Sequence, residues 1–313
     1  MQDLWRGHLD LWGSSCCLPH FSSIKILNLK FKITLVSPTS VRVNLLNMEI
    51  YNTPSFLVDT LRQRRQGLAS LIDVPAIFWS GCSSPRNFPA NTFPFRASSH
   101  FLYFAGMPLE KAAICLEGGK TTLFIDEVKP ESALWHGEMP TTAEIATAIG
   151  ADAVYPLTKL ELYAPGSATI AVQDATTVLQ QSRFLKRPVS PAKVLQGIDL
   201  ELARAVVSLR LNHDDAAIEE LRQAADVTVQ AHLAGMVVSS GAQKEADVRA
   251  AMEHIINAND MTCAYRSIVT VRGEVLHNEQ YYNPLQPGDL LLVDVGAETA
   301  TGWASDVTRT WPV

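Results

Sequence analysis

The chain has 313 residues, of which 47% are hydrophobic and 19% are charged, and this composition excludes a disordered or collagen-like protein. The formal net charge of −6 provides no broad basic surface, so we expect no nucleic-acid partner. No apolar run reaches the roughly 18 residues that span a bilayer, so no membrane partner is expected either. Five cysteines, with Cys16 beside Cys17, do not make a disulfide framework, and we expect a reducing, cytoplasmic location.

Residues 1–47 differ from the rest of the chain in charge. They hold five basic and two acidic side chains, a net charge of +3 within a protein of net charge −6. One interpretation is a poorly ordered extension. The other, which we favour, is that the native start is Met48 and that the upstream bases are translated by mistake. Mass spectrometry of the native N-terminus distinguishes the two.

Residues 48–188 alternate between helical and strand patterns, which predicts an α/β domain with a mixed sheet. An amphipathic helix is predicted over Leu57–Leu71, and Gly118-Gly119 is predicted to be a two-residue hairpin turn. A second helix is predicted over Thr142–Ile149. Strands are predicted over Pro75–Trp79, Lys111–Glu117, Lys120–Asp126, Ala151–Tyr155 and Ala168–Val172.

Residues 189–313 form a second region after a predicted linker, Pro188–Pro191. Helices are expected over Asp199–Leu211, Asp215–Met236 and Lys244–Ile256, followed by strands over Tyr265–Val271, Leu290–Val295 and Trp303–Trp311. Asp214 or Asp215 is expected to cap the second helix, with Gly235 and Ser239-Ser240-Gly241 ending it. Its predicted apolar face consists of Ile218, Leu221, Ala225, Val229, Leu233 and Met236. His213, His232 and His254 are expected on helical surfaces.

Two carboxylates near the end of the chain are candidate metal ligands. Asp294 interrupts the apolar run Leu290–Val295, where a carboxylate is costly unless it is paired or bound to metal. Asp306 follows twelve residues later, on the strand expected to return beside the first, and hard divalent cations prefer such oxygen ligands. The alternative is structural: a turn aspartate at Asp294, and an ion pair between Asp306 and Arg309. His277 is a further candidate, as a proton shuttle or metal neighbour.

The residues at these positions resemble a known family. Asp294-Val-Gly-Ala-Glu298 and Ser305-Asp306-Val-Thr-Arg-Thr-Trp-Pro312 are similar to the metal-ligand signature of Xaa-Pro aminopeptidases (aminopeptidase P), in the pita-bread metallopeptidase family M24. His277, in Leu-His-Asn, resembles that family's active-site histidine, and Tyr265 resembles its substrate-side tyrosine. The family's amino-terminal domain has motifs similar to Phe95-Arg-Ala-Ser-Ser-His-Phe-Leu-Tyr-Phe-Ala-Gly106 and Leu134-Trp-His-Gly137.

The resemblance covers Thr53 to Val313 and implies a fold and a reaction. The fold is an α/β amino-terminal domain of the creatinase/aminopeptidase P type, followed by an incomplete α+β pita-bread domain. The reaction is metal-dependent release of the first residue from peptides with proline in second position, with two divalent ions, usually Mn²⁺. Asp294 would bind one ion, Asp306 would bridge both, and His277 and Tyr265 would contact substrate. His277 would also help to protonate the leaving nitrogen.

The resemblance also implies three further ligands, one His and two Glu, which lie downstream of the aspartates in the family. The sequence ends at Val313 without them, so we expect the 313-residue chain to be inactive. Three interpretations stay open. The sequence is an incomplete gene model or fragment of an aminopeptidase that forms a dimer or tetramer; it is a non-catalytic dimerisation or binding module; or it belongs to a related dipeptidase (prolidase-like) or creatinase.

Overall fold

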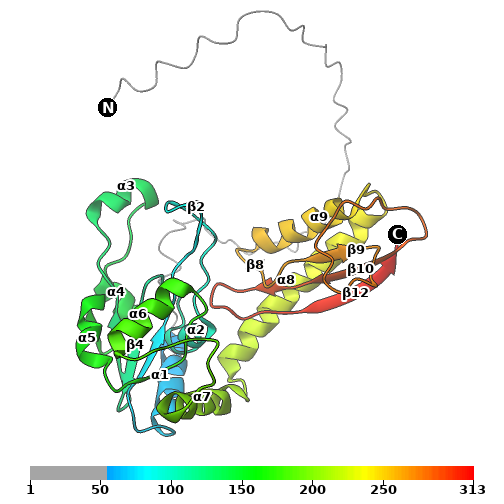
Figure 1. Ribbon diagram of the computed structural model, residues 1–313. Coiled ribbons are helices and arrows are strands. Elements are labelled where there is room, and N and C mark those ends of the chain that lie inside the picture. Colours follow the sequence, from blue (N-terminus) through cyan, green and yellow to red (C-terminus); the bar gives the residue numbers. More distant parts are fainter. Residues whose placement is uncertain (1–54) are drawn as a thin grey trace, which may run out of the picture. The chain divides into compact units, whose positions relative to one another are not determined.

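The computed structural model describes residues 55–313, and Figure 1 shows their helices and strands. The expected extension over residues 1–47 and the proposed start at Met48 lie outside the described residues. The amino-terminal region contains the helices α1 (Ser55–Ala69), α2 (Ser99–Ala105), α3 (Ala133–His136), α4 (Thr142–Ala148), α5 (Leu160–Tyr163) and α6 (Ala175–Leu185). Its strands are β1 (Ala76–Trp79), β2 (Pro85–Phe88), β3 (Asn91–Thr92), β4 (Ala113–Glu117), β5 (Lys120–Phe124), β6 (Ala153–Tyr155) and β7 (Ala168–Thr169).

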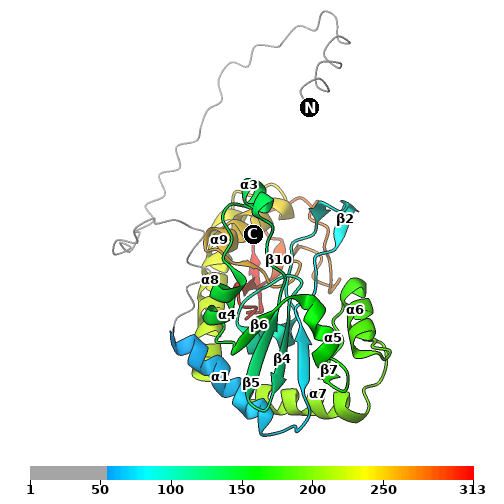
Figure 2. The same cartoon turned by 90° about the vertical axis from the view of Figure 1, so that its left-hand side faces the viewer.

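A five-stranded mixed sheet forms the centre of this region, in the order β6-β5-β4-β1-β7 (Figure 2). β1 is antiparallel to β4 and parallel to β7, and β5 is antiparallel to β4 and parallel to β6. Gly118 and Gly119 join β4 to β5 with φ angles of +53° and +78°, which glycine adopts without steric cost. The mixed sheet and its hairpin turn were both predicted; the short helices α2, α3, α5 and α6 and the small β2–β3 hairpin were not.

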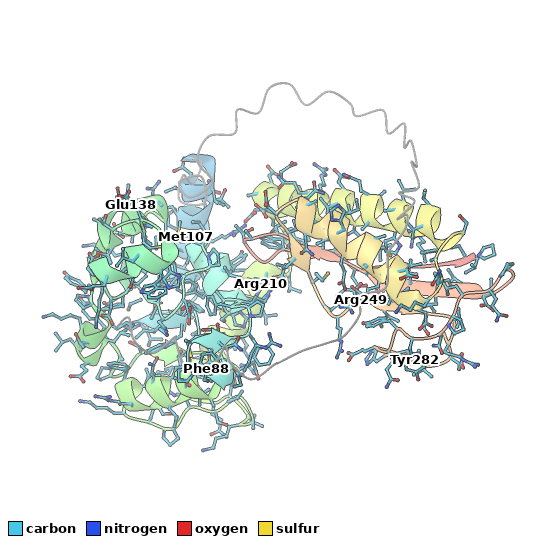
Figure 3. All side chains as sticks on the ribbon, turned by 90° about the horizontal axis from the view of Figure 1, so that it is seen from above. Phe88, Met107, Glu138, Arg210, Arg249 and Tyr282 are labelled. Carbon is cyan, nitrogen blue, oxygen red and sulfur yellow. The ribbon has the colours of Figure 1, made fainter. Side chains whose placement is uncertain are left out.

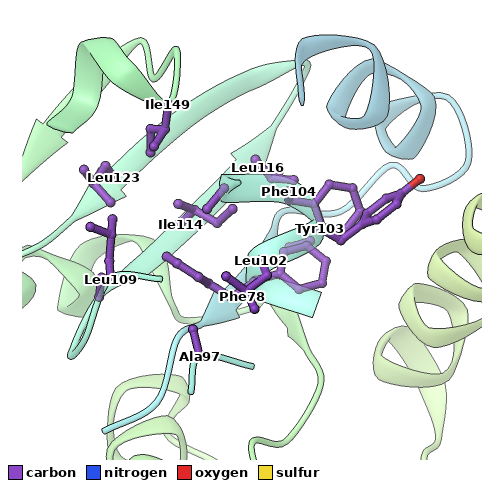
Figure 4. Packing of buried hydrophobic residues seen from close by; sticks show 14 of the residues in the cluster. Phe78, Ala97, Leu102, Tyr103, Phe104, Leu109, Ile114, Leu116, Leu123 and Ile149 are labelled. Atoms are coloured by element: carbon purple, nitrogen blue, oxygen red, sulfur yellow. The ribbon is translucent and has the colours of Figure 1, made fainter. Parts of the chain in front are cut away.

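Helices cover both faces of the five-stranded sheet, and β1, next to the central strand β4, is buried along its whole length. On one face Ala76 and Phe78 of β1 belong to a core with α1, α2, α4 and α7 (Gly197–Arg210), and the Phe78 and Phe104 rings lie 4.6 Å apart (Figure 4). On the other face Ile77 and Trp79 pack with residues of α5 and α6. A strand buried on both sides has no polar alternation, as the sequence of β1 shows.

The carboxy-terminal region consists of two long helices and a small antiparallel sheet. The helices are α8 (Asp215–Ser239) and α9 (Glu245–Ala258), and the strands are β8 (Thr262–Cys263), β9 (Ile268–Thr270), β10 (Leu290–Val295), β11 (Ala297–Glu298) and β12 (Val307–Pro312). The three longest strands have the order β12-β10-β9, and β11 pairs with β8. Packing of these two helices on an antiparallel sheet confirms the predicted architecture, although β9 and β12 are shorter than expected. Asp214 caps α8 by accepting a hydrogen bond from the Ala217 amide. It is one of the two residues predicted for this cap.

The predicted apolar face of α8 is wrong. Val229 and Leu233 are more than half exposed, whereas the buried side of the helix is made largely of small residues. Those buried residues are Ala217, Ala224, Val227, Thr228, Ala231, His232, Gly235 and Ser239. Gly235 does not end the helix: it lies inside it, where an added Cβ would be 2.7 Å from Met252 Sδ. Small side chains on this side let α9 approach closely, and the larger apolar side chains face outward.

Candidate metal and catalytic site

Asp294 lies near the end of β10, on the face of the sheet that the helices do not cover. Leu291, Val293 and Val295 point to the core formed with α8 and α9, and the residues between them point the other way. Asp294 is therefore half-buried rather than enclosed in the core, which corrects the reasoning from its apolar neighbours. It pairs with Thr308 across the ladder, so the alternative of a turn aspartate is also wrong.

Asp306 immediately precedes β12 and is exposed. The last pair of the β10–β12 ladder is Val295 with Val307, and beyond it the Ser305 amide donates to the Ala297 carbonyl at 2.9 Å. Gly296 makes this close approach possible, because a Cβ there would lie 1.9 Å from the Ser305 carbonyl oxygen. The Arg309 guanidinium donates to the Thr308 carbonyl, and the described part of the chain contains no ion pair between Asp306 and Arg309.

Tyr265 connects the two carboxylates. Its hydroxyl donates a short hydrogen bond to Asp294 Oδ1 and lies 3.1 Å from Asp306 Oδ1. Partial burial and the two neighbouring carboxylates raise the pKa of the Tyr265 phenol, the burial contributing most. A phenol has one proton, so the two carboxylates share a single donor. The strand pairing thus brings both predicted metal ligands to one point, together with the predicted substrate-side tyrosine.

His277 is not part of this cluster. It lies exposed in the loop between β9 and β10, and no hydrogen bond joins it to Asp294, Asp306 or Tyr265 within residues 55–313. The same loop carries Tyr282, which is labelled in Figure 3 with Arg249 of α9. The role assigned to His277 stays a prediction.

The buried residue Glu245 anchors the loop that carries His277. At the first position of α9, its carboxylate accepts hydrogen bonds from the Val271 amide at 2.9 Å and the Thr270 hydroxyl at 3.1 Å. It also accepts from the Asn283 side chain at 2.9 Å and the Asn283 amide at 3.2 Å. Residues on both sides of His277 therefore meet at one carboxylate. Glu245 was not among the predicted site residues, although an acidic side chain in the first turn of a predicted helix was a signal for it.

His232 is buried, not on a helical surface as expected, with 4% of its area exposed. Its Nε2 lies 3.3 Å from the Val295 carbonyl oxygen, its Nδ1 has no partner among the described residues, and its ring packs edge-on against Trp311. Burial lowers its pKa below the ordinary value of 6.5. His213 lies in the loop before α8, and His254 is exposed on α9.

The cluster agrees with a divalent-metal site in the chemistry of its donors but not in their number. Two carboxylates on an open face are suitable ligands for a hard cation. Within residues 55–313, no group of three or more His, Cys, Asp or Glu side chains is arranged to hold a metal ion. A cavity of about 430 Å³ lies elsewhere, between residues that follow β1 and β7, and none of the four predicted site residues lines it.

Comparison with family models matches both regions of the chain. Residues 61–174 match the aminopeptidase P N-terminal domain, and residues 219–313 match metallopeptidase family M24. The chain belongs to the aminopeptidase P family. Asp294 and Asp306 lie in the segment that matches the M24 model, and this segment follows the amino-terminal match along the chain. The sequence motifs implied the same order, so the resemblance and the fold class are confirmed.

Similar proteins agree with this family. A probable Xaa-Pro aminopeptidase of Phaeosphaeria nodorum is 28% identical over 236 residues, which is 70% of this chain and 48% of that protein. Human Xaa-Pro aminopeptidase 3 is 27% identical over 280 residues, 80% of this chain and 54% of that protein. The fold is similar to aminopeptidase P from E. coli, with a TM-score of 0.68 and 22% identity, covering 82% of this chain and 62% of that structure. The chain thus spans about half the length of these curated relatives.

No helix among residues 55–313 is both long and apolar enough to cross a membrane.

Proposed function

We propose that a protein containing this region is a metal-dependent aminopeptidase that releases the first residue of peptides with proline in second position. The observation that carries the proposal is the cluster of Asp294, Asp306 and Tyr265, inside the segment that matches the M24 model. The names of the relatives support the substrate class. A solved E. coli aminopeptidase P with the inhibitor Pro-Leu supports a proline-containing ligand.

The residues of the cluster have separate proposed roles. Asp294 and Asp306 would hold divalent metal, for which we propose Mn²⁺, and the metal when bound supplies Lewis-acid polarisation and an activated water. Tyr265 orients both carboxylates through its hydroxyl. A proline nitrogen leaves as a secondary amine and must be protonated, and His277 is the proposed group for that proton because its loop is anchored beside β9.

The 313-residue chain by itself is proposed to lack this activity at the family's normal rate. The resemblance implies five ligands, and the described residues bring only two carboxylates together. Two alternatives keep their support. The exposed apolar side of α8 favours a binding or dimerisation module, and a prolidase-like dipeptidase shares the M24 fold. A homo-oligomer and a cytoplasmic location are also proposals, tested by light scattering and by cell fractionation.

Metal titration and peptide cleavage test the proposal. The purified 313-residue chain is mixed with Mn²⁺, and free Mn²⁺ is counted by electron paramagnetic resonance. We expect weak binding that Asp294→Asn and Asp306→Asn each remove, and that Asp226→Asn, an exposed aspartate on α8, leaves intact. In a longer protein that contains this region and releases the first residue from a Xaa-Pro peptide, the same two substitutions should abolish that release. Robust Mn²⁺-dependent release of the first residue by the 313-residue chain would refute the proposal that two carboxylates are too few ligands for activity.

A further inference from the structure

A closed turn lies between β10, which carries Asp294, and β12, which Asp306 immediately precedes. It runs from Glu298 to Ala304, which form an isolated bridge. Within it the Thr299 amide donates to the Trp303 carbonyl and the Gly302 amide donates to the Thr299 carbonyl, both at 2.9 Å. Gly302 has a φ of +84°, which a residue with a side chain rarely adopts. The turn is therefore a defined structure rather than a loose loop.

The amino-terminal domain contacts this turn directly. Arg96 Nε lies 2.6 Å from Glu298 Oε1, in an ion pair whose glutamate side chain is 8% exposed and whose arginine side chain is 48% exposed. Gly302 lies against Leu102 of α2, so closely that an added Cβ would be 2.6 Å from Leu102 Cδ1. Arg96 and Leu102 both belong to the Phe95–Gly106 segment, and the tip of the hairpin lies beside α2 in Figure 1.

Trp303 makes a second set of contacts. Its ring lies 5.7 Å from the Arg64 guanidinium and packs edge-on against His213. Arg64 is buried on α1 and bonds to Asp214, the cap of α8, at 2.7 Å. On the other side of the turn, the Thr301 hydroxyl donates to Glu220 of α8 at 2.6 Å. Groups from both regions of the chain therefore contact the turn.

The position of the turn affects Asp306 more than Asp294. Asp294 is inside the ladder and pairs with both β9 and β12. Asp306 lies between the last ladder pair, at Val307, and the turn that closes at Ala304. Its backbone is therefore fixed on one side by the sheet and on the other by the turn.

We propose that Arg96 and Glu298 are positioning residues: through this ion pair the amino-terminal domain holds the 298–304 turn and thereby sets the place of Asp306 relative to Asp294. This assigns a role to the Phe95–Gly106 motif, which the aminopeptidase function does not otherwise use, and to Glu298, which is not itself a ligand in the cluster. The consequence for metal binding rests on the proposed function; the consequence for the turn does not.

The geometry makes Glu298 the sensitive member of the pair. An exposed ion pair contributes little, but a buried carboxylate that loses its cation is left desolvated and unpaired. Replacing Arg96 by glutamine should drive Glu298 toward water and open the turn. Replacing Glu298 by glutamine removes the charge that holds the Arg96 side chain on the turn. The effects of the two substitutions on the turn should therefore not add.

Hydrogen–deuterium exchange of the 313-residue chain tests the positioning of the turn. Amides of Thr299, Gly302 and Ser305 are compared in wild type, Arg96→Gln, Glu298→Gln and the double variant. We expect each single variant to speed their exchange about tenfold or more, and the double variant to add nothing further. The matched control is Arg187→Gln, which breaks another 2.6 Å ion pair, to Asp199, away from the turn. Arg96→Lys keeps the charge and should fall between wild type and Arg96→Gln.

The Mn²⁺ titration adds a readout that a purely stabilising role would not change. We expect both single variants to weaken Mn²⁺ binding about tenfold, as outer-shell substitutions do, while Arg187→Gln leaves it unchanged. Exchange in the turn equal to wild type overturns the proposal, and so does faster exchange in the control variant as well. Faster exchange with unchanged Mn²⁺ affinity overturns the link to Asp306. If wild type binds no Mn²⁺, the metal function fails, and the exchange data still decide whether Arg96 holds the turn.

Discussion

In the five-stranded sheet helices cover both faces, whereas in the three-stranded sheet α8 and α9 cover one face and no helix of the described chain covers the other. β1 is consequently buried at every position, and β10 alternates between buried and partly exposed residues. The difference explains why a carboxylate is tolerated on β10. A strand with one open face can present Asp294 to solvent without breaking its core, and β1 cannot do the same.

The comparison predicts unequal costs for removing large side chains from the two sheets. Phe78→Ala should lower the free energy of unfolding by about 4 kcal/mol, because the ring is enclosed between the sheet and its helices. Leu290→Ala on β10 should cost less than about 0.5 kcal/mol, because that side chain is 64% exposed. Urea unfolding followed by circular dichroism measures both. A large loss for Leu290→Ala would mean that the open face of β10 is covered.

The stability of the carboxy-terminal region should depend on the buried carboxylate of Glu245. Glu245→Ala should cost about 3 kcal/mol, because four hydrogen-bond donors on the two sides of His277 lose one buried acceptor. Glu245→Gln keeps one acceptor and should cost less. Asp247→Ala removes a neighbouring cap whose bonds are exposed, and should cost about 1 kcal/mol. If urea melts gave equal losses in the free energy of unfolding for Glu245→Ala and Asp247→Ala, Glu245 would not hold the loop in the way proposed.

The sequence predicted the sheets better than the site. The Gly118-Gly119 turn and the helix cap at Asp214 or Asp215 are local signals, and both were confirmed in place. The strand runs were confirmed in their order, although β7, β9 and β12 are shorter than predicted. The predicted facing of α8 was wrong because the prediction rested on large apolar residues, while a close helix contact selects small ones such as Ala231 and Gly235. The first-turn position of Glu245 was visible in the sequence, but its role in the loop was not, because its four donors come from residues 25 to 38 positions away.

Long-range contacts also separate what could and could not be predicted within the site. The pairing of two strands was enough to predict that Asp294 and Asp306 meet. The hydroxyl that joins them, the Arg96 ion pair to Glu298 and the burial of His232 depend on how distant segments pack. None of these has a local pattern, because each needs the geometry of at least two elements at once.

Burial of His232 predicts a modest pH dependence in the carboxy-terminal region. Its pKa is lowered in the folded state, so the unfolded chain binds the proton more readily. The stability that depends on neutral His232 is present above pH 6.5 and is lost as the pH falls below that value. His232→Gln should flatten this part of the stability curve. An identical acid limb in His232→Gln would show that other groups cause it.

The smallest expected effect tests which side of α8 faces the core. Leu233 was predicted to be buried and is 57% exposed, so Leu233→Ser should change the free energy of unfolding by less than about 0.5 kcal/mol. The neighbouring position on the opposite side gives the contrast. Gly235→Ala adds one methyl group against Met252 and should destabilise by about 2 kcal/mol, despite the better helix propensity of alanine. If Leu233→Ser costs as much as a core truncation, the outer side of α8 has a partner in solution. Light scattering of the same samples would then show whether that partner is a second copy of the chain.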